Sequence, residues 1–178
     1  MNIVKTSLNN CVIIRPKVFS DERGFFLETF HRSRYADLAK IMLPIVQDNH
    51  SRSSKNVLRG LHFQKTKPQG KLVRVVSGEV YDVAVDIRKN SSTFGCWEGV
   101  ILSEDNKKQL WVPPGFAHGF VVLSDVADFE YKCTDYYDPS DEGSILWCDP
   151  DLGINWPVEN PILSDKDINA ARFADLIH

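Results

Sequence analysis

Two histidines stand where their chemistry could serve proton transfer. His62 lies in the β-type run Leu58–Gln64, and His118 lies where the turn at Pro113–Gly115 leads into the next such run. An imidazole titrates near neutral pH, so either side chain could act as a general base or acid. A single histidine in a strand is more often structural, so the choice depends on its neighbours.

Polar and charged side chains surround these histidines in runs that otherwise look apolar. Such groups are rarely buried without partners. Two interpretations stay open: they line a cavity in a β-barrel, where cations would favour an anionic ligand such as phosphate, or they form an ordinary solvent-facing surface. The set is Arg59, Gln64, Lys71, Arg74 and Asp82.

The same residues disfavour a metal site. Jelly-roll proteins that bind metals use a His-x-His pair, a downstream carboxylate and a distant histidine, but here Gln64 and Lys71 replace two of those ligands. A cation at a ligand position opposes binding of another cation. The glycine-rich nucleotide-binding motifs and the G-x-S-x-G elbow are absent from the sequence. We expect neither a metal nor a cofactor.

Apolar and polar residues alternate with a period of two in the segments that carry these residues. In Val80–Ile87, Tyr81, Val83 and Val85 fall on one face, while Asp82 and its alternate neighbours fall on the other. Further β-rich runs, separated by turn residues, predict an all-β antiparallel jelly-roll barrel. These runs are Cys11–Pro16, Gly24–Thr29, Val57–Gln64, Lys71–Val76, Gly95–Leu102, Gln109–Val112, Gly119–Leu123 and Asp128–Tyr137.

A few short helices should flank the barrel. Ser33–Met42 has helical spacing of apolar residues, and the tail from Ser164 begins with a capping-box-like sequence and continues toward Leu176. No low-complexity linker or internal repeat divides the chain. We therefore expect one domain spanning residues 1–178.

Composition excludes several classes of protein. The 178 residues are 43% hydrophobic and 25% charged, which is typical of a soluble globular domain. A net charge of −3 argues against a nucleic-acid-binding surface, because such a surface needs excess Lys and Arg. Apolar runs fall short of a membrane span, and the N-terminus lacks a signal-peptide hydrophobic region. Four scattered cysteines without a C-x-x-C fit a reducing compartment, so we expect a cytoplasmic protein that associates with neither nucleic acid nor membrane.

Eight short motifs follow one another along nearly the whole chain. They are Asp21–Phe26, Gln47–Ser51, Leu58–Gln64, Gln69–Arg74, Gly78–Val80, Pro114–Phe120, Tyr131–Thr134 and Leu163–Asp167. In this order they resemble the dTDP-4-dehydrorhamnose 3,5-epimerase family, cupin-fold enzymes that act on a nucleotide-linked keto-sugar. The resemblance implies conversion of dTDP-4-keto-6-deoxy-D-glucose to dTDP-4-keto-L-rhamnose through an enolate, without metal or cofactor, in dTDP-L-rhamnose biosynthesis.

The resemblance also assigns four catalytic roles. It implies that His62 is the base, that Asp167 orients and charges it, and that Tyr131 is the acid on the opposite face. Lys71 would stabilise the enolate oxygen, with His118 as a further sugar contact. From the sequence alone, Asp167 is better explained as a residue of the helix cap at Ser164, and only the resemblance places it in the site.

Substrate contacts and assembly follow from the same resemblance. Arg23 and Arg59 would bind the pyrophosphate, and Tyr137, or its neighbour Tyr136, would stack on the thymine. The family forms homodimers, which makes Arg23 and Phe26 candidates for contributing to the partner's site. The remaining substrate-binding positions implied are Glu28, Gln47, Asp48, Asn49, Lys71, Glu142 and Lys166.

Four alternatives stay open on sequence grounds. A relative that inverts one carbon, or one that moves the ketone between C3 and C4, would need the same base and enolate stabiliser. A metal-dependent cupin oxygenase is less favoured, because the ligand set is incomplete. A non-catalytic cupin that binds a sugar nucleotide would have the cavity without turnover.

Overall fold

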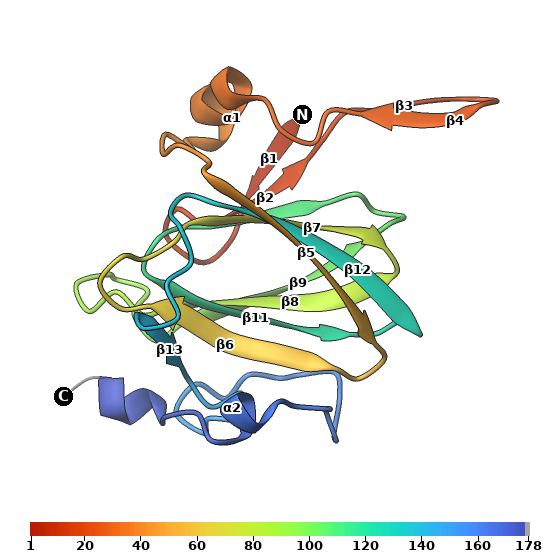
Figure 1. Cartoon of the computed structure of the whole chain (residues 1–178). Coiled ribbons are helices and arrows are strands. Elements are labelled where there is room, and N and C mark those ends of the chain that lie inside the picture. Colours follow the sequence, from red (N-terminus) through yellow and green to blue (C-terminus); the bar gives the residue numbers. More distant parts are fainter. Residues whose placement is uncertain (177–178) are drawn as a thin grey trace.

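Two antiparallel sheets lie face to face in a computed structural model that describes residues 1–176 (Figure 1). The six-stranded sheet has the order β1-β2-β10-β7-β12-β5, and the five-stranded sheet has the order β13-β6-β11-β8-β9. The strands of the first sheet are β1 (Asn2–Lys5), β2 (Val12–Arg15), β10 (Gln109–Val112), β7 (Lys71–Ser77), β12 (Val126–Cys133) and β5 (Gln47–Ser54). Those of the second are β13 (Glu142–Ser144), β6 (Leu58–Gln64), β11 (Phe116–Val122), β8 (Glu79–Asp86) and β9 (Trp97–Ser103).

Successive side chains of β8 point alternately into the core between the two sheets and to the outer face of the five-stranded sheet. Val80 and Ala84 belong to the core between the sheets, with Phe120 and Phe129. Tyr81, Val83 and Val85 pack in a second cluster on the outer face of the five-stranded sheet. Asp82 shares the inward face with Val80 and is fully buried. The predicted antiparallel β fold and the two faces of this strand are therefore confirmed.

Residues 145–176 cover the outer face of the five-stranded sheet (Figure 1). Phe173 and Leu152 are buried there against Val83 and Ile145. The prediction of one tail helix from Ser164 is wrong: the structure has a single turn, α2 (Asp165–Ile168), and a separate 3₁₀ turn, η1 (Phe173–Leu176).

The helix α1 (Arg32–Ala39) packs on the outer face of the six-stranded sheet. Tyr35 and Ala39 are buried against Leu72 and Trp111. The helix ends before the predicted Met42, because Lys40 adopts a left-handed conformation with φ of 60°. None of the described helices is long and apolar enough to cross a membrane.

A two-stranded hairpin, β3 (Val18–Asp21) and β4 (Gly24–Leu27), extends away from the sheets (Figure 1). Phe19, Phe25 and Phe26 are 52%, 60% and 69% exposed on it. Sequence analysis identified the second strand and the turn but not β3. It also did not identify β1, β5 or β13, and it extended β12 beyond Cys133.

Strands β6 and β11 approach each other closely beside the histidines. A Cβ atom on Gly60 would lie 2.5 Å from the Cα of Gly119, and Gly60 has a φ of +134°. The register pairs His62 with His118 and Arg59 with Phe120, with an irregularity between the two pairs. Glycine at both positions is thus what allows the strands to bring the two histidines opposite each other.

We expect Gly60→Ala to lower the free energy of unfolding by about 3 kcal/mol or more, because it adds a steric overlap to backbone strain. Gly24→Ala is the matched control, since Gly24 has a φ of +125° with nothing within 4 Å of the added Cβ. It should cost only about 1 kcal/mol. Urea denaturation measures both; equal losses would show that the strand contact contributes nothing.

Candidate active site

A cavity of about 350 Å³ opens between the two sheets. Strands of both sheets supply its wall, through inward-facing side chains of β5, β6, β7, β12 and β13. Of the predicted site residues it brings together Gln47, Asn49, His62, Lys71, Tyr131, Tyr137 and Glu142. The cavity interpretation of the polar residues is therefore supported for His62, Gln64 and Lys71.

His62 and Asp167 form a close pair at this cavity. The distance between His62 Nε2 and Asp167 Oδ1 is 2.6 Å, and the Asp167 side chain is only 3% exposed. The Ser164 hydroxyl donates to the other carboxylate oxygen at 2.8 Å. With a carboxylate accepting at Nε2, the ring keeps Nδ1 as its basic nitrogen. Asp167 thus belongs to the helix cap and to the histidine pair at once.

The charge of Asp167 is stabilised despite its burial. Burial pushes the pKa of this carboxyl upward, but hydrogen bonds from His62 and Ser164, together with nearby positive charge at His62 and Lys166, outweigh that effect. The pKa consequently lies below its ordinary value. An ionised partner therefore faces the imidazole across the neutral pH range.

Lys71 extends from the opposite sheet, where it pairs in register with Cys133 of β12. Burial lowers the pKa of its ammonium group, while Cys133, Glu142 and Asp82 oppose the shift. A partly desolvated cation exerts a strong field inside such a cavity. Lys71 could therefore stabilise a negative oxygen bound there.

Tyr131 lines the same cavity from the neighbouring strand. Burial raises the pKa of its phenol above the ordinary value of 10.0, as do the charges of Cys133 and Glu142, with Arg59 acting in the other direction. The phenol therefore keeps its proton at neutral pH, as a proton donor requires.

His118 lies deeper than His62 and has its own carboxylate. Its Nε2 is 2.9 Å and 3.0 Å from the two oxygens of Asp82, and both residues are buried. The ring also stacks on Phe129. The sequence pattern places Asp82 among the polar residues that could line a cavity, but only the structure shows that it pairs with His118.

Glu142 and Lys166 form an ion pair at the edge of the cavity. The Tyr137 hydroxyl also donates to Glu142, at 2.9 Å. Burial alone would raise the pKa of Glu142, but the hydrogen bonds from Lys166 and Tyr137 hold it below its ordinary value. Arg59 lies nearby and donates to the Ser53 hydroxyl at 3.0 Å.

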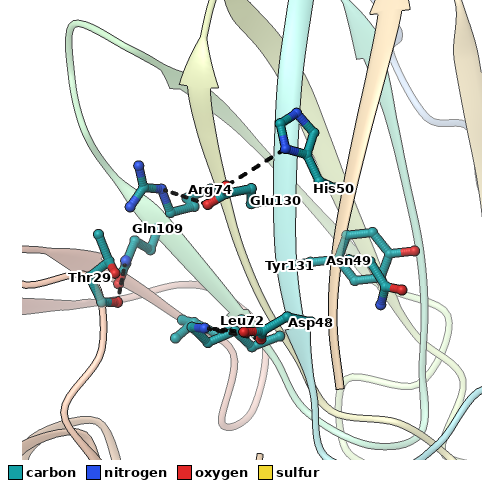
Figure 2. A pocket seen from close by; sticks show the side chains of 10 residues that line it. Thr29, Asp48, Asn49, His50, Leu72, Arg74, Gln109, Glu130 and Tyr131 are labelled. Atoms are coloured by element: carbon teal, nitrogen blue, oxygen red, sulfur yellow. Dashed lines mark hydrogen bonds and ion pairs between the residues drawn. The ribbon is translucent and has the colours of Figure 1, made fainter. Parts of the chain in front are cut away.

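Asp48 and Arg74 point to the other face of the six-stranded sheet (Figure 2). They line a separate cavity of about 210 Å³ there, where Asp48 pairs with Lys132 at 2.9 Å and Arg74 with Glu130 at 3.8 Å. Of the two interpretations left open for Arg74, the structure supports the outward-facing one, because Leu72, Arg74 and Val76 alternate with the inward residues of β7. The side chain of Asp48 does not join the predicted site in this structure.

Three predicted residues near the N-terminal end lie outside the central cavity. Arg23 and Phe26 belong to the hairpin, where Arg23 pairs with Asp21. Glu28 pairs with Arg34 of α1. The structure therefore does not bring these residues to the cavity of their own chain.

Phe63, Gln64 and Gln69 also line the cavity. The sequence pattern places Gln64 among the polar residues that could line a cavity and at a lost metal-ligand position, and it places Phe63 and Gln69 only within motifs, so none of the three was predicted to bind substrate. Within residues 1–176, no three His, Cys, Asp or Glu side chains cluster in a way that could hold a metal ion.

Comparisons with known proteins agree with one another. Residues 5–175 match the family model described as dTDP-4-dehydrorhamnose 3,5-epimerase. The enzymes of that name from Shigella flexneri and Salmonella typhimurium are 57% and 58% identical, covering 98% and 96% of this chain and 97% and 94% of theirs.

A solved relative shares the fold. The dTDP-6-deoxy-D-glucose-3,5-epimerase from Legionella pneumophila, in complex with dTDP-4-keto-L-rhamnose, superposes with a TM-score of 0.95 at 56% identity, over 98% of this chain and 96% of that one. With a matching family model and relatives this similar over nearly their full lengths, the chain belongs to the dTDP-4-dehydrorhamnose 3,5-epimerase family.

Proposed function

We propose that the whole chain forms one epimerase domain, which converts dTDP-4-keto-6-deoxy-D-glucose to dTDP-4-keto-L-rhamnose in dTDP-rhamnose biosynthesis. The observation that carries the proposal is that His62, which is hydrogen-bonded to the buried Asp167 carboxylate, lines one cavity with Lys71 and Tyr131. These groups supply a base, an anion stabiliser and an acid. Membership of the family supports the same substrate.

Deprotonation is the first step. The hydrogens at C3 and C5 both flank the C4 ketone, so removal of either gives an enolate at the same oxygen. His62 takes the proton through its free ring nitrogen, and Asp167 stabilises the imidazolium that forms. One base and one anion stabiliser can therefore serve both carbons.

Lys71 stabilises the enolate. Negative charge grows on O4 as the proton leaves, so a fixed ammonium group there stabilises the transition state more than the ketone. His118, held by Asp82, provides a further contact to the sugar. Both steps are proton transfers, so the scheme needs no redox cofactor.

Reprotonation from the opposite face inverts the carbon. Tyr131 donates this proton, and its raised pKa keeps the phenol protonated for the task. Arg59 binds the pyrophosphate. Tyr137 stacks on the thymine, and its hydroxyl donates to Glu142, which also pairs with Lys166 at the edge of the cavity.

The active form is a homodimer in which each hairpin completes the partner's cavity. Exposed aromatic side chains on a projecting hairpin are typical of an interaction surface. Arg23 and Phe26 lie on this hairpin, away from the cavity of their own chain. The hairpin thus supplies both residues in trans.

Proton exchange in D₂O tests the reaction. We expect the wild-type protein to place deuterium at both C3 and C5 of the keto-sugar, as followed by NMR. His62→Asn should lower exchange at both carbons by roughly 10²- to 10⁴-fold, because it removes the base. Tyr131→Phe should keep exchange but lose inversion.

Label at C3 alone would identify an enzyme that inverts one carbon only. Unchanged exchange in His62→Asn would rule out the proposed base. Absence of label in a wild-type protein that still binds dTDP would identify a sugar-nucleotide-binding protein without this activity.

The pH profile tests Lys71. Its pKa is lowered from 10.5, so the ammonium is lost, and kcat/KM should fall, as pH rises toward a value below 10.5. Lys71→Arg should reduce the rate but move this alkaline limb to higher pH, because a guanidinium stays charged. Tyr131→Phe, which keeps proton exchange, should leave the alkaline limb of the exchange rate in place. A limb unmoved by Lys71→Arg would assign it to another group.

Mixed dimers test the hairpin. A chain with Arg23→Ala and Phe26→Ala and a chain with His62→Asn should each be impaired alone. Random heterodimers contain one intact site if the hairpin acts in trans, so an equal mixture should recover about a quarter of wild-type activity. A monomer in sedimentation, or no recovery on mixing, would contradict the arrangement.

A further inference from the structure

Three glutamine side chains hold the backbone of the segment that carries Tyr136 and Tyr137. This segment, residues 134–138, has neither helix nor strand. The carboxamide oxygens of Gln47 and Gln64 accept the backbone N–H groups of Tyr137 and Asp138, at 2.9 Å and 2.8 Å. The Gln69 amide donates to the Asp135 carbonyl at 2.8 Å.

The three glutamines come from opposite sides of the cavity that they line. Gln47 belongs to the six-stranded sheet and Gln64 to the five-stranded sheet, while Gln69 precedes β7. Side-chain hydrogen bonds thus anchor two consecutive backbone amides, those of Tyr137 and Asp138, to both sheets. Without a regular ladder of its own, the segment depends on these anchors.

Gln64 makes more of these contacts than the other two. Its amide group donates to the Lys67 carbonyl at 2.7 Å and to the Tyr136 carbonyl at 3.3 Å, while its oxygen accepts from Asp138. The side chain is buried, with 6% exposure. Only a carboxamide offers donors and an acceptor on one planar group, so aspartate, glutamate or an apolar residue could not replace these bonds.

The second loop tied by Gln64 is itself anchored. The Asp141 carboxylate accepts the backbone N–H groups of Thr66 and Lys67, both at 2.9 Å. The Lys67 carbonyl is therefore a fixed point from which Gln64 reaches the Tyr136–Asp138 backbone. On the far side of that backbone, the Tyr137 hydroxyl donates to Glu142.

We propose that Gln64 is a positioning residue for nucleotide binding: it fixes the Tyr136–Asp138 backbone so that the Tyr137 ring stands ready to stack on the base. This proposal rests on the proposed function, which places the nucleotide of a dTDP-sugar beside Tyr137. Gln64 acts on affinity and not on proton transfer, because His62 is held separately by Asp167 at 2.6 Å. The sequence pattern marks Gln64 as a possible cavity-lining residue and as the replacement of a metal ligand, but it does not indicate this positioning role.

Gln64→Met, which keeps the length of the side chain but removes the carboxamide, tests this role. We expect the Kd for dTDP and the KM for the keto-sugar to rise about five- to tenfold, as for the loss of a few hydrogen bonds that order a binding segment. The kcat should change by less than about twofold. Calorimetry with dTDP and steady-state kinetics measure the two effects.

Asn106→Leu is the matched control. Asn106 likewise bridges backbone groups of one turn, donating to the Ile101 carbonyl at 3.0 Å and accepting from Lys108 N at 2.9 Å. It lies between β9 and β10 and does not line the cavity. Its replacement should lower the unfolding temperature without changing the Kd for dTDP.

A double-mutant cycle with Tyr137→Ala decides whether Gln64 acts through this segment. If it does, Gln64→Met should no longer change the Kd for dTDP once the Tyr137 ring is removed. An undiminished effect in that background, an unchanged Kd in the single variant, or a fall in kcat alone would overturn the proposal. The proposed function fails separately, when the wild-type protein neither binds dTDP nor exchanges protons of the keto-sugar.

Discussion

The Asp167 carboxylate is almost completely removed from water, and hydrogen bonds from His62 and Ser164 are what make its charge tolerable there. Burying an unpaired charge is costly, so the carboxylate requires these hydrogen-bond donors. This requirement determines where the C-terminal part of the chain must lie. The packing of Phe173 and Leu152 on the five-stranded sheet holds that part in place.

The rest of the cavity follows from the same need for compensated charge. Lys71 enters from one sheet, while Glu142 and Asp82 enter from the other, and their opposite charges counteract the effect of burial on the lysine. His118 and Asp82 form a second, more deeply buried hydrogen-bonded pair. A barrel interior that would otherwise be apolar can hold a reactive cation because its counter-charges are built into neighbouring strands.

Strands in which apolar and polar residues alternate could be predicted from the sequence, whereas a strand with polar residues on both faces could not. The β8 strand was recognised because apolar residues alternate there with Asp82. The β5 strand was not, since its inward residues, such as Asn49, line the cavity and its outward ones, such as His50, form ion pairs on the other face. Apolar periodicity cannot reveal a strand that is polar on both sides. Asp167 shows the complementary limit, because its partner is distant in sequence and no local pattern reports it.

The separation of His62 and Asp167 by 105 residues has a consequence for protein synthesis. The strand that carries the histidine leaves the ribosome long before the helical turn that carries the carboxylate, and folding of a growing chain begins with its N-terminal parts. Throughout that interval, the His62 ring lacks its hydrogen-bond partner. Docking of the segment that carries Asp167 covers the outer face of the five-stranded sheet and supplies this partner, so the same late step completes both the fold and the histidine–carboxylate pair.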